Sequence, residues 1–244
     1  MKYLVVAGLM LTSCSESGDA AIAEREFEAA RSEGAEPVIP VSQLDESELA
    51  QIAFPSQEPL RDADGAEWIF RNHEMVSIAE GLALVSEGTL VEPTGSHSTA
   101  GRLDVFYFSD PREGLFVKER YPEAVRLGSL GALAEWALSD KFTENPTIYA
   151  SGGFTGQGIT EGCTVLTELT ANGPRTIATI PDYYGGTSFD GEDFAIEGKI
   201  RSIFKGKGFE VAYSGSETGV LQYRWNGSEF TTDDEAVLSH CGFE

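Results

Sequence analysis

The sequence predicts an α+β fold dominated by β-structure, in which an antiparallel meander sheet carries one packed helix at about residues 129–141. Three observations lead to this expectation. From residue 67 onwards, short apolar runs alternate with turn residues, as they do in sheets built from consecutive strands. Near the C-terminal end, alternating apolar residues flank Asn226-Gly227, and Asn-Gly in this setting is the strongest short-range hairpin signal. Only one stretch after residue 67 has a helical period.

Two segments have the features of helices. Asp45 to Phe54 should form a short helix, with Asp45 as the cap and Glu48 three residues later completing a capping box. Ser129 to Lys141 should form the helix that packs on the sheet. Ser129 is placed as its cap, and an apolar stripe follows at helical spacing, comprising Leu130, Leu133, Ala134, Ala137 and Leu138.

The first group of predicted strands lies between residues 68 and 118. His73-Glu74 is interpreted as a turn between the first two strands, and Pro93 to Gly101 as a small, polar loop. The strands themselves are the apolar runs Trp68–Phe70, Met75–Ala79, Leu82–Val85, Leu103–Phe108 and Leu115–Lys118.

The second group begins after Pro146. Ala171 to Pro174 is a plausible hairpin turn between two of its strands. Gly152 to Gly162 and Tyr183 to Gly191 are rich in glycine, and we expect them to be long connections of the kind that often carries function. The predicted strands are Thr147–Ala150, Cys163–Thr170, Arg175–Ile180, and the alternating runs Phe209–Tyr213 and Leu221–Trp225.

The N-terminus has the layout of a secretory signal. Lys2 precedes an apolar stretch, and Leu11-Thr12-Ser13 leads into Cys14. This arrangement resembles that of bacterial lipoprotein precursors. The resemblance implies cleavage before Cys14, acyl chains on that cysteine, and, with Ser15 following, export to the outer membrane facing the periplasm. Two or three acyl chains would anchor the protein firmly, because each buried methylene contributes about 0.8 kcal/mol.

The resemblance also divides the chain. Residues 1–13 are the expected signal peptide, and residues 14–44 the lipidated cysteine and an acidic, flexible tether. Residues 45–244 are then one β-rich globular domain. A formal charge of -23 argues against a nucleic-acid partner, because a phosphate backbone would be repelled. The simplest interpretation of this acidity is that it keeps an exported protein soluble, and the alternative is a specific role in binding a cation or a basic partner.

Cys163 and Cys241 remain once Cys14 is assigned to lipid. In an oxidising envelope such a pair is best interpreted as one disulfide. The competing interpretation is a metal site, but the three histidines, His73, His97 and His240, offer no ligand spacing with the cysteines.

Several short motifs were weighed as sites. Gly95-Ser96-His97-Ser98 lacks the constrained turn of a serine nucleophile. Ser151 to Gly158 superficially resembles a phosphate-binding loop, but no Lys-Ser/Thr follows, so no nucleotide is expected. This glycine segment is either structural or a contact for a ligand or partner. The candidate contact residues are Gly153, Phe154, Gln157, Tyr183 and Tyr184.

Two acidic clusters, Asp62 to Glu67 and Asp190 to Asp193, carry oxygen ligands that suit Ca²⁺. Neither fits the twelve-residue helix–loop–helix register, so at most weak Ca²⁺ binding is expected, and no metal or cofactor is predicted. Aromatic residues gather at Phe106–Phe108, Tyr183-Tyr184 and near the C-terminal end. They are either core residues or an exposed stacking surface for peptide or sugar.

These observations favour a lipid-anchored envelope protein with a non-catalytic binding or structural role, whose membrane contact is through Cys14 and whose partner is an envelope protein. The alternative is an envelope hydrolase that uses carboxylates near the glycine-rich segments. An enzyme needs a concave pocket where at least two titratable groups converge. A binding module should instead expose an apolar or aromatic patch.

Overall fold

The computed structural model describes residues 44–241, apart from 57, 63–64, 80, 92–98, 189, 235 and 239–240. These residues belong to one compact unit, Ile39–Glu244. The predicted signal peptide, Cys14 and the tether up to residue 43 lie outside the described residues, as do His97 and His240.

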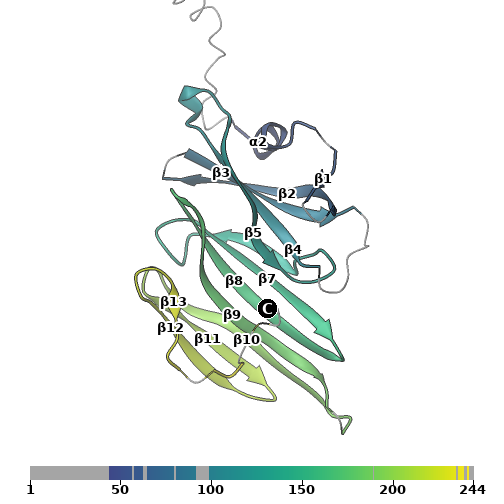
Figure 1. The fold of residues 1–244 in the computed structure, drawn as a ribbon. Coiled ribbons are helices and arrows are strands. Elements are labelled where there is room, and N and C mark those ends of the chain that lie inside the picture. The colour runs from purple at the N-terminus through teal and green to yellow at the C-terminus, as the bar shows by residue number, and fades with distance from the viewer. Residues whose placement is uncertain are drawn as a thin grey trace, which may run out of the picture. The chain divides into compact units, whose positions relative to one another are not determined.

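The strands form two antiparallel meander sheets (Figure 1). In both sheets every hydrogen-bonded neighbour is also the neighbour in sequence. The five-stranded sheet comprises β1 (Leu60–Arg61), β2 (Glu67–Ile78), β3 (Gly81–Leu90), β4 (Gly101–Phe108) and β5 (Val117–Leu127). The eight-stranded sheet comprises β6 (Glu135–Ser139), β7 (Thr147–Gly156), β8 (Ile159–Thr170), β9 (Gly173–Thr187), β10 (Asp193–Phe204), β11 (Gly208–Gly215), β12 (Gly219–Trp225) and β13 (Phe230–Thr231).

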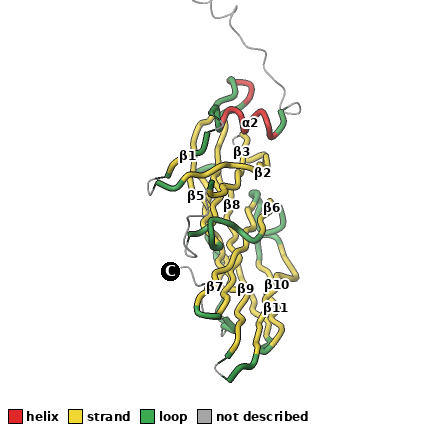
Figure 2. Tube along the Cα trace, turned by 90° about the vertical axis from the view of Figure 1, so that its right-hand side faces the viewer, coloured by secondary structure: helices red, strands yellow, loops and turns green. Residues whose placement is uncertain are grey.

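The predicted fold class is confirmed: the chain is β-dominated, antiparallel and built from meanders. The predicted N-terminal helix is also present as α2 (Glu46–Ala53). Its capping box is complete, because the Asp45 carboxylate accepts from the Glu48 N–H at 2.9 Å and Glu48 accepts from the Asp45 N–H at 3.2 Å. In Figure 2 helix α2 lies beside the five-stranded sheet. A short 3₁₀ helix, Pro111–Glu113, lies between β4 and β5.

The predicted packed helix at 129–141 is wrong. Ser129 and Ala132 form an isolated β-bridge, and Glu135–Ser139 is strand β6, at the edge of the eight-stranded sheet. Leu130 and Gly131 have φ angles of 56° and 74°, which are incompatible with a right-handed helix. The Trp136 indole N–H donates to Glu87 of β3 at 3.1 Å, so a distant strand holds this segment extended.

Two other local expectations also differ from the structure. Gly152 to Gly162 is not a long loop, because β7 and β8 run through it and leave only Gln157-Gly158 as the turn. Tyr183 to Thr187 likewise continues β9. His73-Glu74 lies inside β2, beside a β-bulge at Asn72, whose φ is 49°.

Three groups of buried side chains make up the core. One lies where α2 covers the five-stranded sheet, around Leu49 and Phe106. A second joins the two sheets and contains Val85, Val105, Ile148 and Cys163. The third lies within the eight-stranded sheet and includes Ile180, Phe209, Val211, Tyr213 and Tyr223.

The five-stranded sheet also buries a charged cluster. Asp104 is fully buried, and its carboxylate accepts from Arg102 Nη2 at 2.6 Å and from Arg120 Nη2 at 2.7 Å. The Glu123 N–H donates to the same carboxylate at 3.0 Å. The Arg102 guanidinium lies 5.3 Å from the ring centroid of Trp68, so this cluster is enclosed by aromatic packing.

Among the described residues, no helix reaches the length and apolarity that spanning a bilayer requires.

Candidate functional site

The eight-stranded sheet curls, so that strands far apart in its order face one another. β6 and β10 are separated by β7, β8 and β9. In a flat sheet four strand spacings would place them roughly 19 Å apart. Glu135 of β6 and Lys199 of β10 nevertheless line the same hollow, which has a volume of about 490 Å³. We call this space the sheet hollow.

The curl closes at its other end. The loop between β6 and β7 places Phe142 in the core, where its ring lies 5.6 Å from that of Phe209 on β11. The Phe142 carbonyl also accepts from the Gly206 N–H at 2.7 Å, at the turn between β10 and β11. Apolar packing therefore fills one end of the curl and the sheet hollow occupies the other.

The sheet hollow lies where β9 and β10 separate. These strands pair only between Tyr183–Thr187 and Asp193–Glu197. Pro181 has no N–H to offer a neighbouring strand. Its carbonyl instead accepts from the Tyr213 hydroxyl at 2.8 Å, and the Tyr213 ring covers Gly198, where a Cβ would lie 2.7 Å from the ring. These side chains hold the two strands apart.

A chain of polar groups lines one wall of the sheet hollow. The Thr164 hydroxyl donates to the Asp182 carboxylate at 2.5 Å and lies 3.4 Å from the Tyr149 hydroxyl. Tyr149 in turn donates to Glu135 at 3.3 Å. Residues from the adjacent strands β6, β7, β8 and β9 thus connect two carboxylates along this wall, and Ser151 lies beside them on β7.

Burial raises the pKa of the Asp182 carboxyl; the hydrogen bond from Thr164 opposes this shift, and the charges of Glu135 and Glu197 add to it. Lys199 pairs with Glu197 at 3.1 Å. Within the described part of the chain, no Lys or Arg forms an ion pair with Asp182 or Glu135. A half-buried carboxylate with no paired cation lowers the stability of the folded state. Carboxyl groups with pKa values shifted in this way are typical of functional sites.

Two of the predicted contact residues lie at or beside the sheet hollow. Tyr183 lines it and is 37 % exposed. Tyr184 packs against the core of the eight-stranded sheet, with its ring 5.3 Å from that of Phe194.

The other three predicted contact residues lie on or beside β7. Gly153 pairs with Gly162, and Gly162 pairs with Tyr183 on the next strand, so these residues form one row across the sheet. Phe154 is on the opposite face of β7 from Ser151, because side chains alternate along a strand. Gln157 is in the turn after β7.

Sequence reasoning missed the polar residues of the sheet hollow. Tyr149 and Thr164 fall inside predicted strands, and Glu135 falls inside the expected helix. Ser151 begins the glycine-rich segment, and Asp182 lies in no predicted element. One local signal was available at Asp182. It follows Pro181 directly at the end of the predicted strand Arg175–Ile180, where an ionisable side chain and a residue without an N–H both need an explanation.

Cys163 and Cys241 form a disulfide, with Cα atoms 5.6 Å apart. Cys163 is fully buried between the two sheets, while its neighbour Thr164 faces the sheet hollow. The disulfide therefore fixes β8 directly behind the polar chain.

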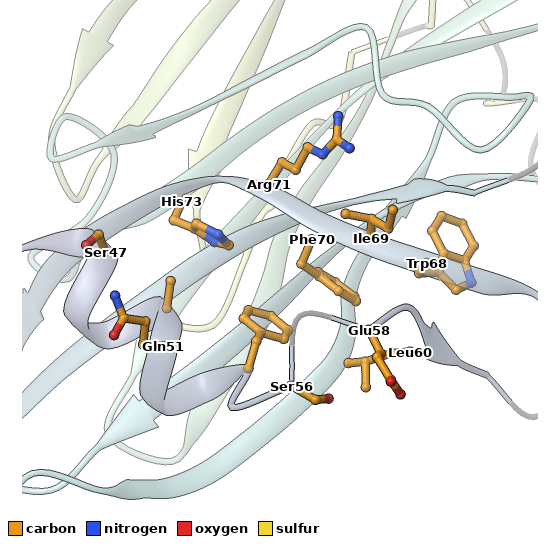
Figure 3. Close-up of a pocket in the computed structure, with 12 residues that line it drawn as sticks. Ser47, Gln51, Ser56, Glu58, Leu60, Trp68, Ile69, Phe70, Arg71 and His73 are labelled. Atoms are coloured by element: carbon orange, nitrogen blue, oxygen red, sulfur yellow. The ribbon is translucent and has the colours of Figure 1, made fainter.

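A second open space of about 510 Å³ lies between α2 and β2 (Figure 3). We call it the α2 groove. The ring of Phe54 stacks on that of Phe70, with their centroids 4.9 Å apart. Burial lowers the pKa of His73, and the charge of Glu46 opposes this shift. In Figure 3 Arg71 points away from α2, while Ser47 and Gln51 of α2 also line this groove. The aromatic rings that line the α2 groove, those of Phe54 and Phe70, are accounted for by the packing of α2 on the sheet.

The acidic clusters have local partners. Asp62 accepts from the Ala66 N–H at 2.9 Å and from the Trp68 indole at 2.8 Å, and Asp193 accepts from the Thr187 hydroxyl at 2.7 Å. Asp64 and the segment Gly95-Ser96-His97-Ser98 lie outside the described residues. The residues with described positions contain no group of three or more His, Cys, Asp or Glu side chains able to hold a metal ion.

Comparison of the chain with protein-family models, with curated proteins and with solved structures found no match. The sheet hollow is therefore interpreted from its own geometry.

Proposed function

We propose that this protein is a lipid-anchored component of the bacterial cell envelope that binds an envelope constituent in the sheet hollow without transforming it. One observation carries the proposal: a hollow of about 490 Å³ in which Asp182, Thr164, Tyr149 and Glu135 converge from four strands. Ligand sites are typically concavities of roughly 300–1,000 Å³ with a few convergent polar groups.

The anchor is proposed from the N-terminal motif alone. Leu11-Thr12-Ser13-Cys14 supports cleavage and acylation at Cys14, and the acidic stretch after it supports a tether between the bilayer and the domain. Intact-mass spectrometry of the purified protein should give a chain that begins at an acylated Cys14. A chain that retains Met1, or a free thiol on Cys14, would contradict the anchor.

A hydrolase is the second candidate, and one observation favours it. Asp182 has a raised pKa, and the hydroxyls of Thr164 and Tyr149 connect it to Glu135. In glycoside hydrolysis one protonated carboxyl donates to the leaving oxygen as the C–O bond breaks. A second, ionised carboxylate takes a proton from the water that attacks the anomeric carbon. The same pair of groups would therefore serve either function.

Affinity selection with an envelope extract separates these possibilities. The full-length acylated protein is compared with two variants, Ser151→Phe, which fills the sheet hollow, and Ser214→Phe, which adds the same ring at an exposed position of β11. We expect the wild type and Ser214→Phe to retain small molecules that Ser151→Phe does not retain. These molecules should be eluted with their chemical structure unchanged.

If the eluted molecules were instead cleavage products, and if their formation required Asp182, the protein would be a hydrolase and the proposed binding role would be wrong. If no retained molecule distinguished Ser151→Phe from Ser214→Phe, neither function could be assigned to the sheet hollow.

A further inference from the structure

The chemistry of the sheet hollow indicates what class of ligand it accepts. Its walls offer acceptors and donors together: the carboxylates of Asp182 and Glu135 and the hydroxyls of Thr164 and Tyr149. A sugar hydroxyl both donates and accepts a hydrogen bond. A polyhydroxylated ligand would therefore use both kinds of group.

The rim supplies an aromatic surface. Tyr183 is 37 % exposed and directly follows Asp182 on β9. The adjacent backbone is bare, because Gly185 has no side chain and a Cβ there would lie 2.7 Å from the Tyr183 hydroxyl. An exposed ring with polar groups beside it matches a sugar ring, which has an apolar C–H face and hydroxyls at its edge.

The wall on the other side of the hollow is apolar. Ile200 and Val211 line it, and the Tyr213 ring lies directly against Gly198. The hollow therefore has one polar wall and one apolar wall. A ligand with hydroxyls on one side and C–H groups on the other would satisfy both.

Two other ligand classes fit less well. An amine would use the carboxylates but leave the hydroxyl groups of the polar wall unused. An extended peptide pairing with β10 would meet Lys199 and Arg201, and then the β-bulge at Ser202, where φ is 49°. Charged side chains and bulges are features that protect strand edges from such pairing.

We propose that the sheet hollow binds a saccharide, with Tyr183 stacking on a sugar ring and Asp182 and Thr164 contacting its hydroxyls. This assignment rests on the binding function proposed above and names its ligand class.

The test uses the full-length acylated protein in a zwitterionic detergent, since sugar-based detergents would compete. The wild type is screened on a glycan array, and hits are measured by calorimetry. Asp182→Asn and Tyr183→Ala should each weaken binding at least about tenfold. Two matched controls should retain wild-type affinity: Asp233→Asn, an exposed carboxylate, and Phe204→Ala, an exposed ring outside the hollow.

Putrescine and lysine methyl ester are measured in parallel. Binding of these amines, lost in Asp182→Asn, with no glycan bound, would overturn the saccharide assignment and leave the binding function intact. Glycans that bound equally well to Asp182→Asn, Tyr183→Ala and the wild type would also overturn it. If neither probe class bound and affinity selection retained nothing in the hollow, both proposals would fail.

Discussion

Replacing Asp104 with asparagine should destabilise the protein more than any other single charge removal described here. The Asp104 carboxylate is fully buried and receives hydrogen bonds from Arg102, Arg120 and the Glu123 backbone at 2.6, 2.7 and 3.0 Å. Removing one partner of a buried ion pair costs about 3–5 kcal/mol, because the remaining charge stays desolvated.

The lower end of this range, about 3 kcal/mol, is expected for Asp104→Asn. The amide keeps part of the hydrogen bonding, and Glu123 still lies 3.2 Å from Arg102 Nη1. In a domain of this size, about 3 kcal/mol corresponds to a fall in Tm of roughly 6–12 °C.

Asp110 provides a matched control. It pairs with Arg112, whose side chain is 82 % exposed, and the hydrogen bond from Arg112 lowers the pKa of Asp110 to about 2. Exposed pairs contribute little to stability, so Asp110→Asn should unfold close to the wild-type midpoint. Urea is the denaturant to use, because guanidinium would screen the exposed pair. Equal midpoints for the two variants would refute the assignment of Asp104 as a buried stabilising centre.

Asp182, the disulfide and Gly215 should each affect stability in a way that can be measured. Asp182→Asn should raise Tm at pH 7, because a carboxyl with a raised folded-state pKa destabilises the native state when it is ionised. In a pH series, the increase in Tm should shrink as the pH falls through the raised pKa towards 3.8, and an increase that stayed constant would contradict this reasoning. Cys241→Ser should lower the free energy of unfolding by up to about 4.5 kcal/mol, since the disulfide joins residues 78 apart. The reduced wild type should unfold at the same midpoint as the variant, and a wild-type midpoint unchanged by reductant would contradict this. In urea unfolding, Gly215→Ala should lower the free energy of unfolding at least twice as much as Gly227→Ala. Both glycines have positive φ, a strain of about 1–2 kcal/mol for alanine, but of the two only Gly215 would place a Cβ 2.0 Å from a carbonyl oxygen. Similar losses in the two variants would mean that the backbone relieves this close approach.

Local signals were sufficient to predict the C-terminal hairpins. The alternating residues Phe209 and Val211 pair with Tyr223 and Leu221 in β12. The Asn226 side chain accepts from the Ser228 and Glu229 N–H groups at 2.9 and 3.0 Å, which is turn chemistry contained within four residues. The capping box of α2 is equally local.

The failures came from distant contacts. In residues 129–141 the apolar spacing fits a helix, but Trp136 reaches Glu87 of the other sheet, and the bridge between Ser129 and Ala132 sets a different backbone. The glycines of β7 were interpreted as loop residues because glycine weakens strands. At Gly152 a Cβ would lie 2.6 Å from the Gly128 backbone, so glycine is needed there for close approach.

The sheet hollow could not be predicted from sequence for the same reason. Glu135 and Lys199 belong to strands that are four positions apart in the sheet, and only its curl brings them together. Alternation along each strand indicates which side chains share a face, but it does not indicate how strongly the sheet bends.

The meander order of both sheets has a consequence for how the chain acquires its structure. Because each strand pairs only with its neighbours in sequence, every ladder can form as a short-range hairpin with a small loop-closure cost. Such topologies have low contact order for all-β proteins and should fold quickly. The long-range contacts, such as the Tyr107 hydroxyl on the Thr170 carbonyl at 2.8 Å, would form only after the hairpins. Amide exchange should therefore report hairpin units that open separately, with the contacts between sheets lost first.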